Sequence, residues 1–184
     1  MHHAIELLFD PDTEAAIRGH WQRLQDAGIP CALADLGASP HVSLGVYDRP
    51  LPERWLEPAR AWFEARAPVS LTFSSVGTFP GGEGVVFLAP VVTDALLDLH
   101  TAYHAAFDEW RSDVRPYYLP GAWVPHCTMG IFLPPEQVTA AMALLQDDTL
   151  PIVGAGTRIE LLAFEGGMAS PVEILAEIPL SART

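Results

Sequence analysis

Pro40-His41-Val42-Ser43-Leu44-Gly45-Val46-Tyr47 is repeated later in the chain as Pro125-His126-Cys127-Thr128-Met129-Gly130-Ile131-Phe132. Every position holds the same residue or a chemically similar one. Each stretch follows a proline and alternates along an apolar run, which is typical of a β-strand. Residues two positions apart in a strand point to the same face, so each copy presents an imidazole beside a hydroxyl. If the two halves of the chain fold alike and face each other, the repeat predicts one site built from His41, Ser43, His126 and Thr128.

The composition is that of a globular domain. The chain has 184 residues, of which 49% are hydrophobic, so it can bury a core, and the disordered and fibrous classes are excluded. No stretch reaches the apolar length of a membrane span, and the first residues lack the basic and apolar regions of a signal peptide. We therefore expect a cytoplasmic protein without a membrane partner.

The two cysteines, Cys31 and Cys127, make neither a disulfide framework nor a Cys-x-x-Cys redox or zinc motif. We interpret both as core thiols. Cys127 lies between His126 and Thr128, so strand alternation turns it away from the predicted site and argues against a nucleophilic role.

The charge of the chain excludes one class of partner. The formal net charge is -13, the pI is near 4.7, and all basic residues are arginines. Such a field repels polyanions, so tight wrapping of long nucleic acid is not expected. A small phosphorylated molecule or an RNA end can still bind where arginines gather locally. Arg111 and Arg115 precede the second motif and are the candidates; the alternative is that both are solvated loop residues.

Hydrophobic periodicity and turn residues divide the chain into strands and helices. The expected strands cover residues 3–9, 40–47, 69–79, 85–89, 125–132, 157–164 and 172–178, and the expected helices cover residues 11–26, 52–65, 93–110 and 135–146. Gly81-Gly82-Glu83-Gly84 indicates a hairpin turn, since it lacks the lysine and the following helix of a phosphate loop. Further turns are expected at Gly154-Ala155-Gly156 and Gly166-Gly167, and a solvated helix end at Asp147-Asp148.

The two halves of the chain match beyond the repeated stretch. Thr13 aligns with Thr93 and His20 with His100 at one offset, whereas the motifs align at a slightly larger one, which indicates an insertion in the loop of residues 111–124. We predict a single α+β domain over residues 1–184, with repeat halves of about residues 3–80 and 84–165 and a final strand at 171–179. Two pseudo-symmetric lobes, each with a mainly antiparallel sheet and two helices, would then enclose a cleft between the motif strands.

Two imidazoles beside two hydroxyls suit the cleavage of a phosphodiester, above all a strained cyclic one. One histidine deprotonates the attacking hydroxyl or water and the other protonates the leaving oxygen, as both can do near neutral pH. Ser43 and Thr128 would donate hydrogen bonds to the non-bridging phosphate oxygens, where charge accumulates. Either His41 or His126 can be the base, depending on how the substrate lies. Activity should follow a bell-shaped pH curve.

The paired Pro-His-x-[Ser/Thr]-[Leu/Met]-Gly strands resemble the two His-x-Thr/Ser signatures of the 2H phosphoesterase superfamily, which includes the 2'-5' RNA ligase-like proteins and cyclic phosphodiesterases. The resemblance covers essentially the whole chain. It implies a bilobal α+β fold and cleavage of 2',3'-cyclic phosphates, or of related 1'',2''-cyclic or 2'-5' linkages, without a metal or another cofactor. It also implies catalysis by His41 and His126, with Ser43 and Thr128 at the phosphate-binding positions. The expected partner is a small phosphorylated substrate or an RNA end, bound by a monomer.

The chain departs from one branch of that superfamily. In the bacterial RNA-ligase branch the second motif is similar to His-x-Thr-Leu-Ala-Arg, whereas this chain has Ile131 where the arginine would fall and Val46 in the first copy. A phosphate-binding cation is thus absent from the place where that branch supplies it. Together with the acidic composition, this argues against RNA ligation and long-RNA binding more than against phosphodiester chemistry.

Further residues are candidates for substrate contacts. Tyr47 and Phe132 each lie an even number of residues after a motif histidine, so strand alternation points them to the same face, where they could stack on a base at the cleft edge. The alternative is that both are ordinary strand-end aromatics partly in the core. Arg115, Tyr117 and Trp123 lie in the loop expected to shape the pocket.

His100 and His104 have the spacing of a metal pair on a helix, but no third ligand accompanies them, so we predict a structural position and no metal site.

Two classes of function remain open. In the enzyme hypothesis the four motif residues hydrolyse a cyclic phosphate or a 2'-5' diester. In the binding hypothesis the same cleft captures a nucleotide or RNA end without turnover. The presence of both histidines and both hydroxyls favours the enzyme, because a binding module has no need of two proton-transfer groups.

Overall fold

Seven strands form one sheet in the computed structural model, which describes residues 1–146, 150–165 and 171–182. They are β1 (His2–Phe9), β2 (His41–Tyr47), β3 (Val69–Thr78), β4 (Val86–Pro90), β5 (Cys127–Gly130), β6 (Ile152–Phe164) and β7 (Glu173–Pro179). The α-helices of the described residues are α1 (Pro11–Asp26), α2 (Ala32–Asp35), α3 (Leu56–Glu64), α4 (Asp94–Ala106) and α5 (Pro135–Leu145), and the 3-10 helices are η1 (Glu53–Trp55), η2 (Asp108–Asp113) and η3 (Pro116–Tyr118). The predicted Asp147-Asp148 helix end and Gly166-Gly167 turn lie outside these residues.

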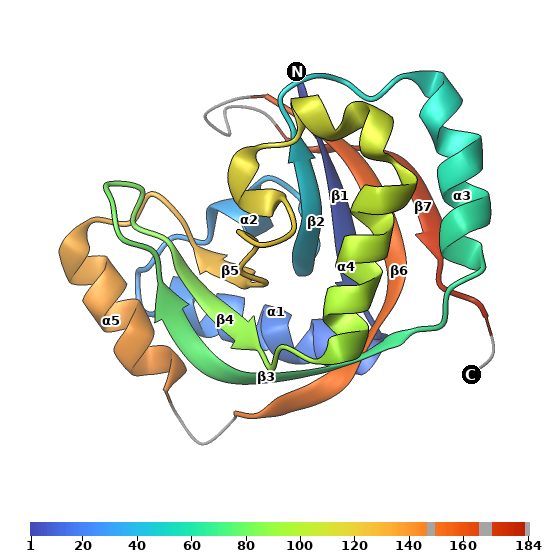
Figure 1. Cartoon of the computed structure of the whole chain (residues 1–184). Coiled ribbons are helices and arrows are strands. Elements are labelled where there is room, and N and C mark those ends of the chain that lie inside the picture. The colour runs from blue at the N-terminus through green and yellow to red at the C-terminus, as the bar shows by residue number, and fades with distance from the viewer. Residues whose placement is uncertain (147–149, 166–170, 183–184) are drawn as a thin grey trace.

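The strands pair in the order β2-β1-β6-β3-β4-β5, and β7 pairs with β6 off this path. Each pair is antiparallel, so the predicted α+β class with a mainly antiparallel sheet is confirmed. Residues 152–156 of β6 pair with β3, residues 156–164 pair with β1, and residues 158–163 pair with β7. Figure 1 shows the sheet curving so that β5, at one end of the order, lies beside β2, at the other end. The two motif strands are therefore neighbours in space.

The main hydrophobic core lies between the helices and one face of the sheet. From α1 it receives Ile17, Trp21 and Leu24, which are three or four residues apart and so share one side of the helix. A smaller cluster, formed by Ala4, Val46 and Leu162, lies on the opposite face of the sheet. No helix in the described part of the chain has the length and apolarity that a membrane crossing requires.

Several predicted boundaries differ from the structure. The helix expected at 93–110 ends as α4 at Ala106 and is followed by η2, and the helix expected at 52–65 begins with η1. The second motif strand is shorter than its pattern predicts, because β5 has only four residues and its partner β4 only five. Pro125, which has no N–H to donate, cannot extend the ladder. His126 thus lies immediately before β5.

The turn predicted at Gly154-Ala155-Gly156 is wrong, because these residues lie inside β6. A Cβ on Gly154 would overlap the Thr13 hydroxyl and lie 2.5 Å from a carboxylate oxygen of Asp10. That carboxylate accepts the Thr13 N–H at 2.9 Å as the N-cap of α1 and the Ala155 N–H at 2.6 Å. Gly154 therefore permits α1 to begin directly against β6. The hairpin turn predicted at residues 81–84 is confirmed, since it joins β3 to β4.

Replacing Gly154 with alanine should lower the free energy of unfolding by about 1–3 kcal/mol, because the added methyl displaces the N-cap of α1. Gly19→Ala is the matched control. Gly19 lies inside α1 with nothing within 4 Å of its Cβ position, so this change should raise stability by up to about 1 kcal/mol. Urea unfolding followed by circular dichroism measures both variants. If both variants changed the free energy of unfolding by the same amount, the close packing of the N-cap of α1 on β6 would be contradicted.

Candidate active site

The two motif histidines are held in the same way. His41 Nδ1 lies 2.8 Å from the carbonyl of Ser39, and His126 Nδ1 lies 2.7 Å from the carbonyl of Val124. A carbonyl oxygen can only accept, so each Nδ1 carries the hydrogen and donates it to the residue two positions earlier. In the neutral ring Nε2 then keeps a lone pair with which to take a proton. Both imidazoles are therefore set to exchange a proton at Nε2.

The four motif residues come together where β2 and β5 meet. His41 opens β2, and Ser43 follows two residues later; their exposed fractions are 9% and 8%. His126 and Thr128 stand at the start of β5 and are half-buried. A positive charge on His41 acts on His126 and lowers the pKa of His126, which follows from their proximity. The structure thus brings both imidazoles and both hydroxyl residues to one place.

A tryptophan supports each motif strand beside its hydroxyl residue. Trp123 donates its indole N–H to the backbone carbonyl of Ser43 at 3.0 Å, and Trp21 donates to the carbonyl of Thr128 at 3.2 Å. Trp21 belongs to α1, before the first motif, whereas Trp123 precedes the second. Each indole therefore holds the motif strand of the other half. The sequence indicated Trp123 as a pocket residue, but Trp21 shows only the spacing of a core side chain.

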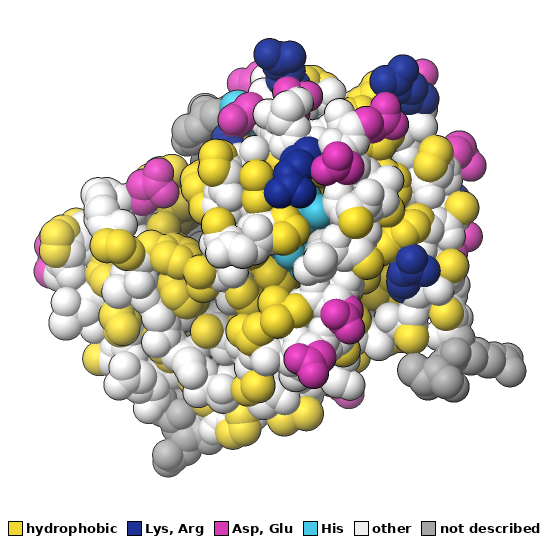
Figure 2. Space-filling model, in the orientation of Figure 1, with side chains coloured by type: hydrophobic (Ala, Val, Ile, Leu, Met, Phe, Trp, Pro, Cys, Tyr) yellow, Lys and Arg dark blue, Asp and Glu magenta, His cyan; other side chains and the backbone are white. Residues whose placement is uncertain are grey.

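Burial favours the neutral form of both imidazoles. Phe79 and Phe87 surround the His126 ring, with ring centroids at 4.9 and 5.3 Å. Desolvation lowers the pKa of His41 and of His126 below the ordinary value, although the hydrogen bond to a backbone carbonyl opposes the shift in each. Figure 2 shows histidine atoms near the middle of the visible face, among mostly hydrophobic and uncharged side chains and directly below an arginine and an acidic side chain.

Comparison with known proteins identifies the family. A family model described as the 2'-5' RNA ligase superfamily matches residues 11–168, which is most of the chain. The chain belongs to the 2'-5' RNA ligase superfamily. Among solved structures, it is similar to TT0787 of Thermus thermophilus, with a TM-score of 0.63, 18% identity and 100% of both chains covered. It is also similar to E. coli LigT complexed with 3'-AMP, with a TM-score of 0.61, 17% identity and 98% of both chains covered. At these identities the structures show a shared fold, and no curated protein matches the sequence.

In this member of the 2'-5' RNA ligase superfamily, two histidines of α4 anchor the loop before the second motif. His100 stacks on Trp123 with ring centroids 3.8 Å apart, and its Nε2 donates to the Tyr118 carbonyl at 2.9 Å. His104 Nε2 donates to the Leu44 carbonyl of β2 at 3.0 Å. No group of three or more metal-ligating side chains occurs among the described residues. The histidine pair therefore joins α4 to the loop and to the first motif strand.

Tyr118 is a site residue that no motif in the sequence singles out. It packs beside Ala4, Val46 and Leu162 on the face of the sheet that carries Ser43. Burial raises the pKa of Tyr118 to about 12, and a hydrogen bond from Ser43 opposes this shift. The Tyr118 side chain therefore stays neutral and lies beside Ser43, the predicted phosphate-binding residue.

The expectation for Tyr47 is corrected by the structure. In the β1–β2 pairing Ile5 faces Gly45 but Glu6 faces Ser43. This irregularity inserts one residue into β2 and reverses the side to which later residues point. Tyr47 is thus turned into the core with 1% of its surface exposed, and its hydroxyl lies 2.5 Å from that of Tyr103. It cannot stack on a base from this position and is the core aromatic of the alternative interpretation.

The other predicted substrate contacts lie in different surroundings. Arg115 donates to Asp48 at 2.8 Å beyond the end of β2, away from the His41 end. Phe132 leaves β5 with a φ of 61° and is 53% exposed, and Tyr117 is 58% exposed. Arg111 lies 3.7 Å from Asp108. Arg115 and Arg111 are thus engaged with carboxylates, and substrate contacts of Tyr117 and Phe132 stay predictions.

The prediction that both cysteines are core thiols is confirmed. Cys31 and Cys127 are buried and unpaired. Burial raises the pKa of Cys31 to about 11 and that of Cys127 to about 12, so neither is a thiolate near neutral pH.

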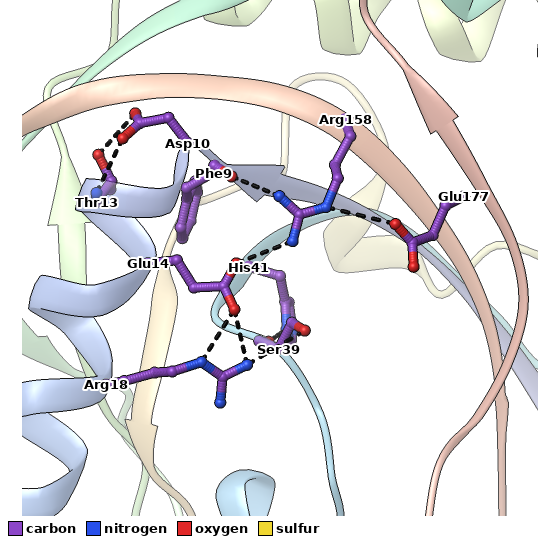
Figure 3. Close-up of polar contacts among 9 residues, drawn as sticks. All are labelled: Phe9, Asp10, Thr13, Glu14, Arg18, Ser39, His41, Arg158 and Glu177. Atoms are coloured by element: carbon purple, nitrogen blue, oxygen red, sulfur yellow. Dashed lines mark hydrogen bonds and ion pairs between the residues drawn. The ribbon is translucent and has the colours of Figure 1, made fainter.

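Charged side chains gather where β2 begins (Figure 3). Arg158 donates to Glu14 at 2.9 Å and to the Phe9 carbonyl at 2.7 Å, and it lies 3.6 Å from Glu177. Arg18 donates to Glu14 at 2.8 Å. Both arginines at this end of the site are therefore engaged with carboxylates.

The protein should lose stability as the pH falls below about 6.5, in part through His100. Burial and the nearby His104 lower the pKa of His100 to about 4. Its neutral form is favoured in the folded state, so this contribution is complete above the ordinary pKa and declines as the pH falls toward 4. Between pH 7 and 5 it amounts to about 2 kcal/mol. The His100→Gln side chain can still donate to the Tyr118 carbonyl but cannot take a charge. Its free energy of unfolding, measured with urea, should therefore decline less between pH 7 and 5 than that of wild type, each compared with its own value at pH 7. The same decline in both proteins would contradict this assignment.

Proposed function

We propose that the chain is a metal-independent phosphodiesterase that cleaves a 2',3'-cyclic phosphate or a 2'-5' phosphodiester of a nucleotide or RNA end. One observation carries the proposal: both motif imidazoles donate Nδ1–H to a backbone carbonyl and keep Nε2 for proton exchange. Each has a hydroxyl two residues further along. Membership of the 2'-5' RNA ligase superfamily supports the same chemistry.

The reaction requires one neutral and one protonated imidazole. The neutral histidine takes a proton from water as the water oxygen forms a bond to phosphorus. The protonated histidine gives its proton to the ribose oxygen as the bond from that oxygen to phosphorus breaks. Ser43 and Thr128 donate hydrogen bonds to the non-bridging oxygens, where negative charge grows. Burial of the two histidines strengthens these interactions, because little water screens them.

Similar solved structures support a nucleotide as the substrate class. E. coli LigT has been solved in complex with 3'-AMP and with NADP+, and the fold of this chain matches these structures with TM-scores of 0.61 and 0.58. Both ligands are small phosphorylated nucleotides. The exposed aromatic rings of Tyr117 and Phe132 could stack on such a base.

The sheet order supports a duplicated, two-lobed architecture, which we also propose. Strands β1, β2 and β3 of the first half correspond to β4, β5 and β6 of the second. If each strand of one half is replaced by its counterpart in the other, the order β2-β1-β6-β3-β4-β5 becomes β5-β4-β3-β6-β1-β2, which is the same order read backwards. This is the symmetry expected of two equivalent halves. The motif strands β2 and β5 then occupy equivalent positions and face one shared site.

Replacing either motif histidine with alanine should slow the turnover of nucleoside 2',3'-cyclic phosphates by about 10²–10⁴-fold, because the general acid or the general base is lost. Wild type and His2→Ala, a histidine of β1 outside the motifs, should both remain active in EDTA. Product formation is followed by chromatography. No turnover by wild type on cyclic phosphates or 2'-5' dinucleotides, with binding retained, would favour the non-catalytic binding module; loss of turnover in EDTA would exclude the metal-independent mechanism.

Removing one motif hydroxyl should lower kcat by about 10²-fold, because the transition state loses a hydrogen-bond donor. Thr128→Val and Ser43→Ala test this, and Thr128→Ser keeps the donor as the matched control. Steady-state kinetics separates the effect on kcat from that on KM. Equal kcat values for Thr128→Val and Thr128→Ser would contradict the role given to the hydroxyl.

A further inference from the structure

Two buried glutamates lie beside His41. Glu6 of β1 faces Ser43 of β2 on one side and Glu160 of β6 on the other. The exposed fractions are 4% for Glu6 and 1% for Glu160. Glu6 Oε2 lies 3.0 Å from Nδ1 of His41. A carboxyl pair therefore stands directly behind the first motif histidine.

This pair is not explained by hydrogen bonding within the fold. The His41 Nδ1–H points to the Ser39 carbonyl, so the Glu6 oxygen touches the ring without receiving its hydrogen. Glu6 Oε2 and Glu160 Oε1 are buried atoms for which the described residues provide no hydrogen-bond partner. Burying such an atom destabilises the fold, because it loses its hydrogen bonds to water and gains none. Two of them on adjacent strands next to a reactive ring indicate a role in the site.

Among the described residues, His41 and Arg158 are the basic side chains that act on the negative charge of this pair. Burial raises the pKa of Glu6 to about 8 and, with repulsion from Glu6, that of Glu160 to about 7. Near neutral pH the two therefore share about one proton and one negative charge. Among the described residues, the other titratable or charged groups that interact with these three side chains are Arg158 and Glu177 from β6 and β7, Tyr118 from the loop before β5, and His126 and Cys127 from the second motif. Arg18 of α1 donates to the hydroxyl of Ser39 at 3.4 Å. Arg158 lowers the pKa of Glu160, but its guanidinium is bound to Glu14 and lies 3.6 Å from Glu177.

The second motif histidine has different surroundings. The His126 ring is enclosed by Phe79 and Phe87, and its pKa responds to burial, to the Val124 carbonyl and to His41. Burial also lowers the pKa of His41, but there the charge of Glu160 opposes the lowering. The two imidazoles therefore share their backbone geometry and differ in their electrostatic surroundings.

We propose that Glu6, supported by Glu160, is a positioning residue that makes His41 the histidine that holds the proton, so that His41 is the general acid and His126 the general base. The effect on His41 stands on the contacts above, whereas the acid and base roles rest on the proposed function. A proton taken up at Nε2 of His41 places an imidazolium 3.0 Å from the Glu6 carboxyl. That charge disfavours a second proton on His126, which stays neutral and takes the proton of water. His41 gives its proton to the leaving oxygen, and solvent restores both rings.

Glu6→Gln tests the proposal on the intact chain without substrate. Histidine titrations followed by NMR should show that the pKa of His41 falls by about one unit, because the negative charge that the two carboxyls share can no longer lie on Glu6, 3.0 Å from the ring. With less charge on His41, the pKa of His126 should rise. Glu160→Gln should move both in the same directions and serves in place of Glu6→Gln if that variant does not fold. Glu173→Gln, which removes an exposed carboxylate of β7, is the control and should change neither.

The same variants have a kinetic readout. In the pH profile of kcat/KM, the basic limb reports the acid and should move to lower pH in Glu6→Gln, with about a tenfold loss at neutral pH. Unchanged titrations of both histidines in a folded Glu6→Gln would overturn the positioning role. Shifted titrations with an unchanged basic limb would overturn the assignment of His41 as the acid. Absence of turnover in wild type would refute the proposed function, while the NMR titration still decides the role of Glu6.

Discussion

The pairing of one strand, β6, with strands from both parts of the sheet is the constraint on which the site depends. Its first residues bond to β3 and its later residues to β1 and β7, so the sheet bends within a single strand. This bend brings β5 beside β2 (Figure 1). Gly154 lies in the part of β6 that pairs with β3 and lets the N-cap of α1 approach the strand. The motif residues meet because backbone hydrogen bonds hold this curvature.

The reacting groups are held mainly by backbone carbonyls. Each motif imidazole donates to the carbonyl two residues before it, and each motif hydroxyl residue has its own carbonyl bound by an indole. Ser39, Trp123 and Val124 lie in the loops that lead into β2 and β5, and Trp21 lies in the packed helix α1. These contacts hold the motif side chains in place without substrate. In the proposed reaction, a site prepared in this way would need little rearrangement when charge develops on the phosphate.

The frame is nearly symmetric, but its electrostatics are not. Glu6 and Glu160 place negative charge beside His41, whereas Phe79 and Phe87 give His126 an apolar enclosure. A proton on one histidine also opposes a proton on the other. Similar backbones can thus support unequal roles, which acid and base catalysis requires.

The sequence by itself determined the α+β class, the two motif strands and the four residues at their meeting point, because alternation with period two is a local property. The expectation that strand alternation places Tyr47 on the same face as His41 was wrong, since the extra residue in β2 is visible only in the pairing with β1. The sequence also missed Gly154 as a strand residue, Trp21 and Tyr118 as site residues, and Glu6 as the neighbour of His41. Those roles arise from contacts between residues far apart in the chain, which depend on how the sheet curves. Only the tertiary structure could therefore decide which side chains surround each histidine and in what charge state.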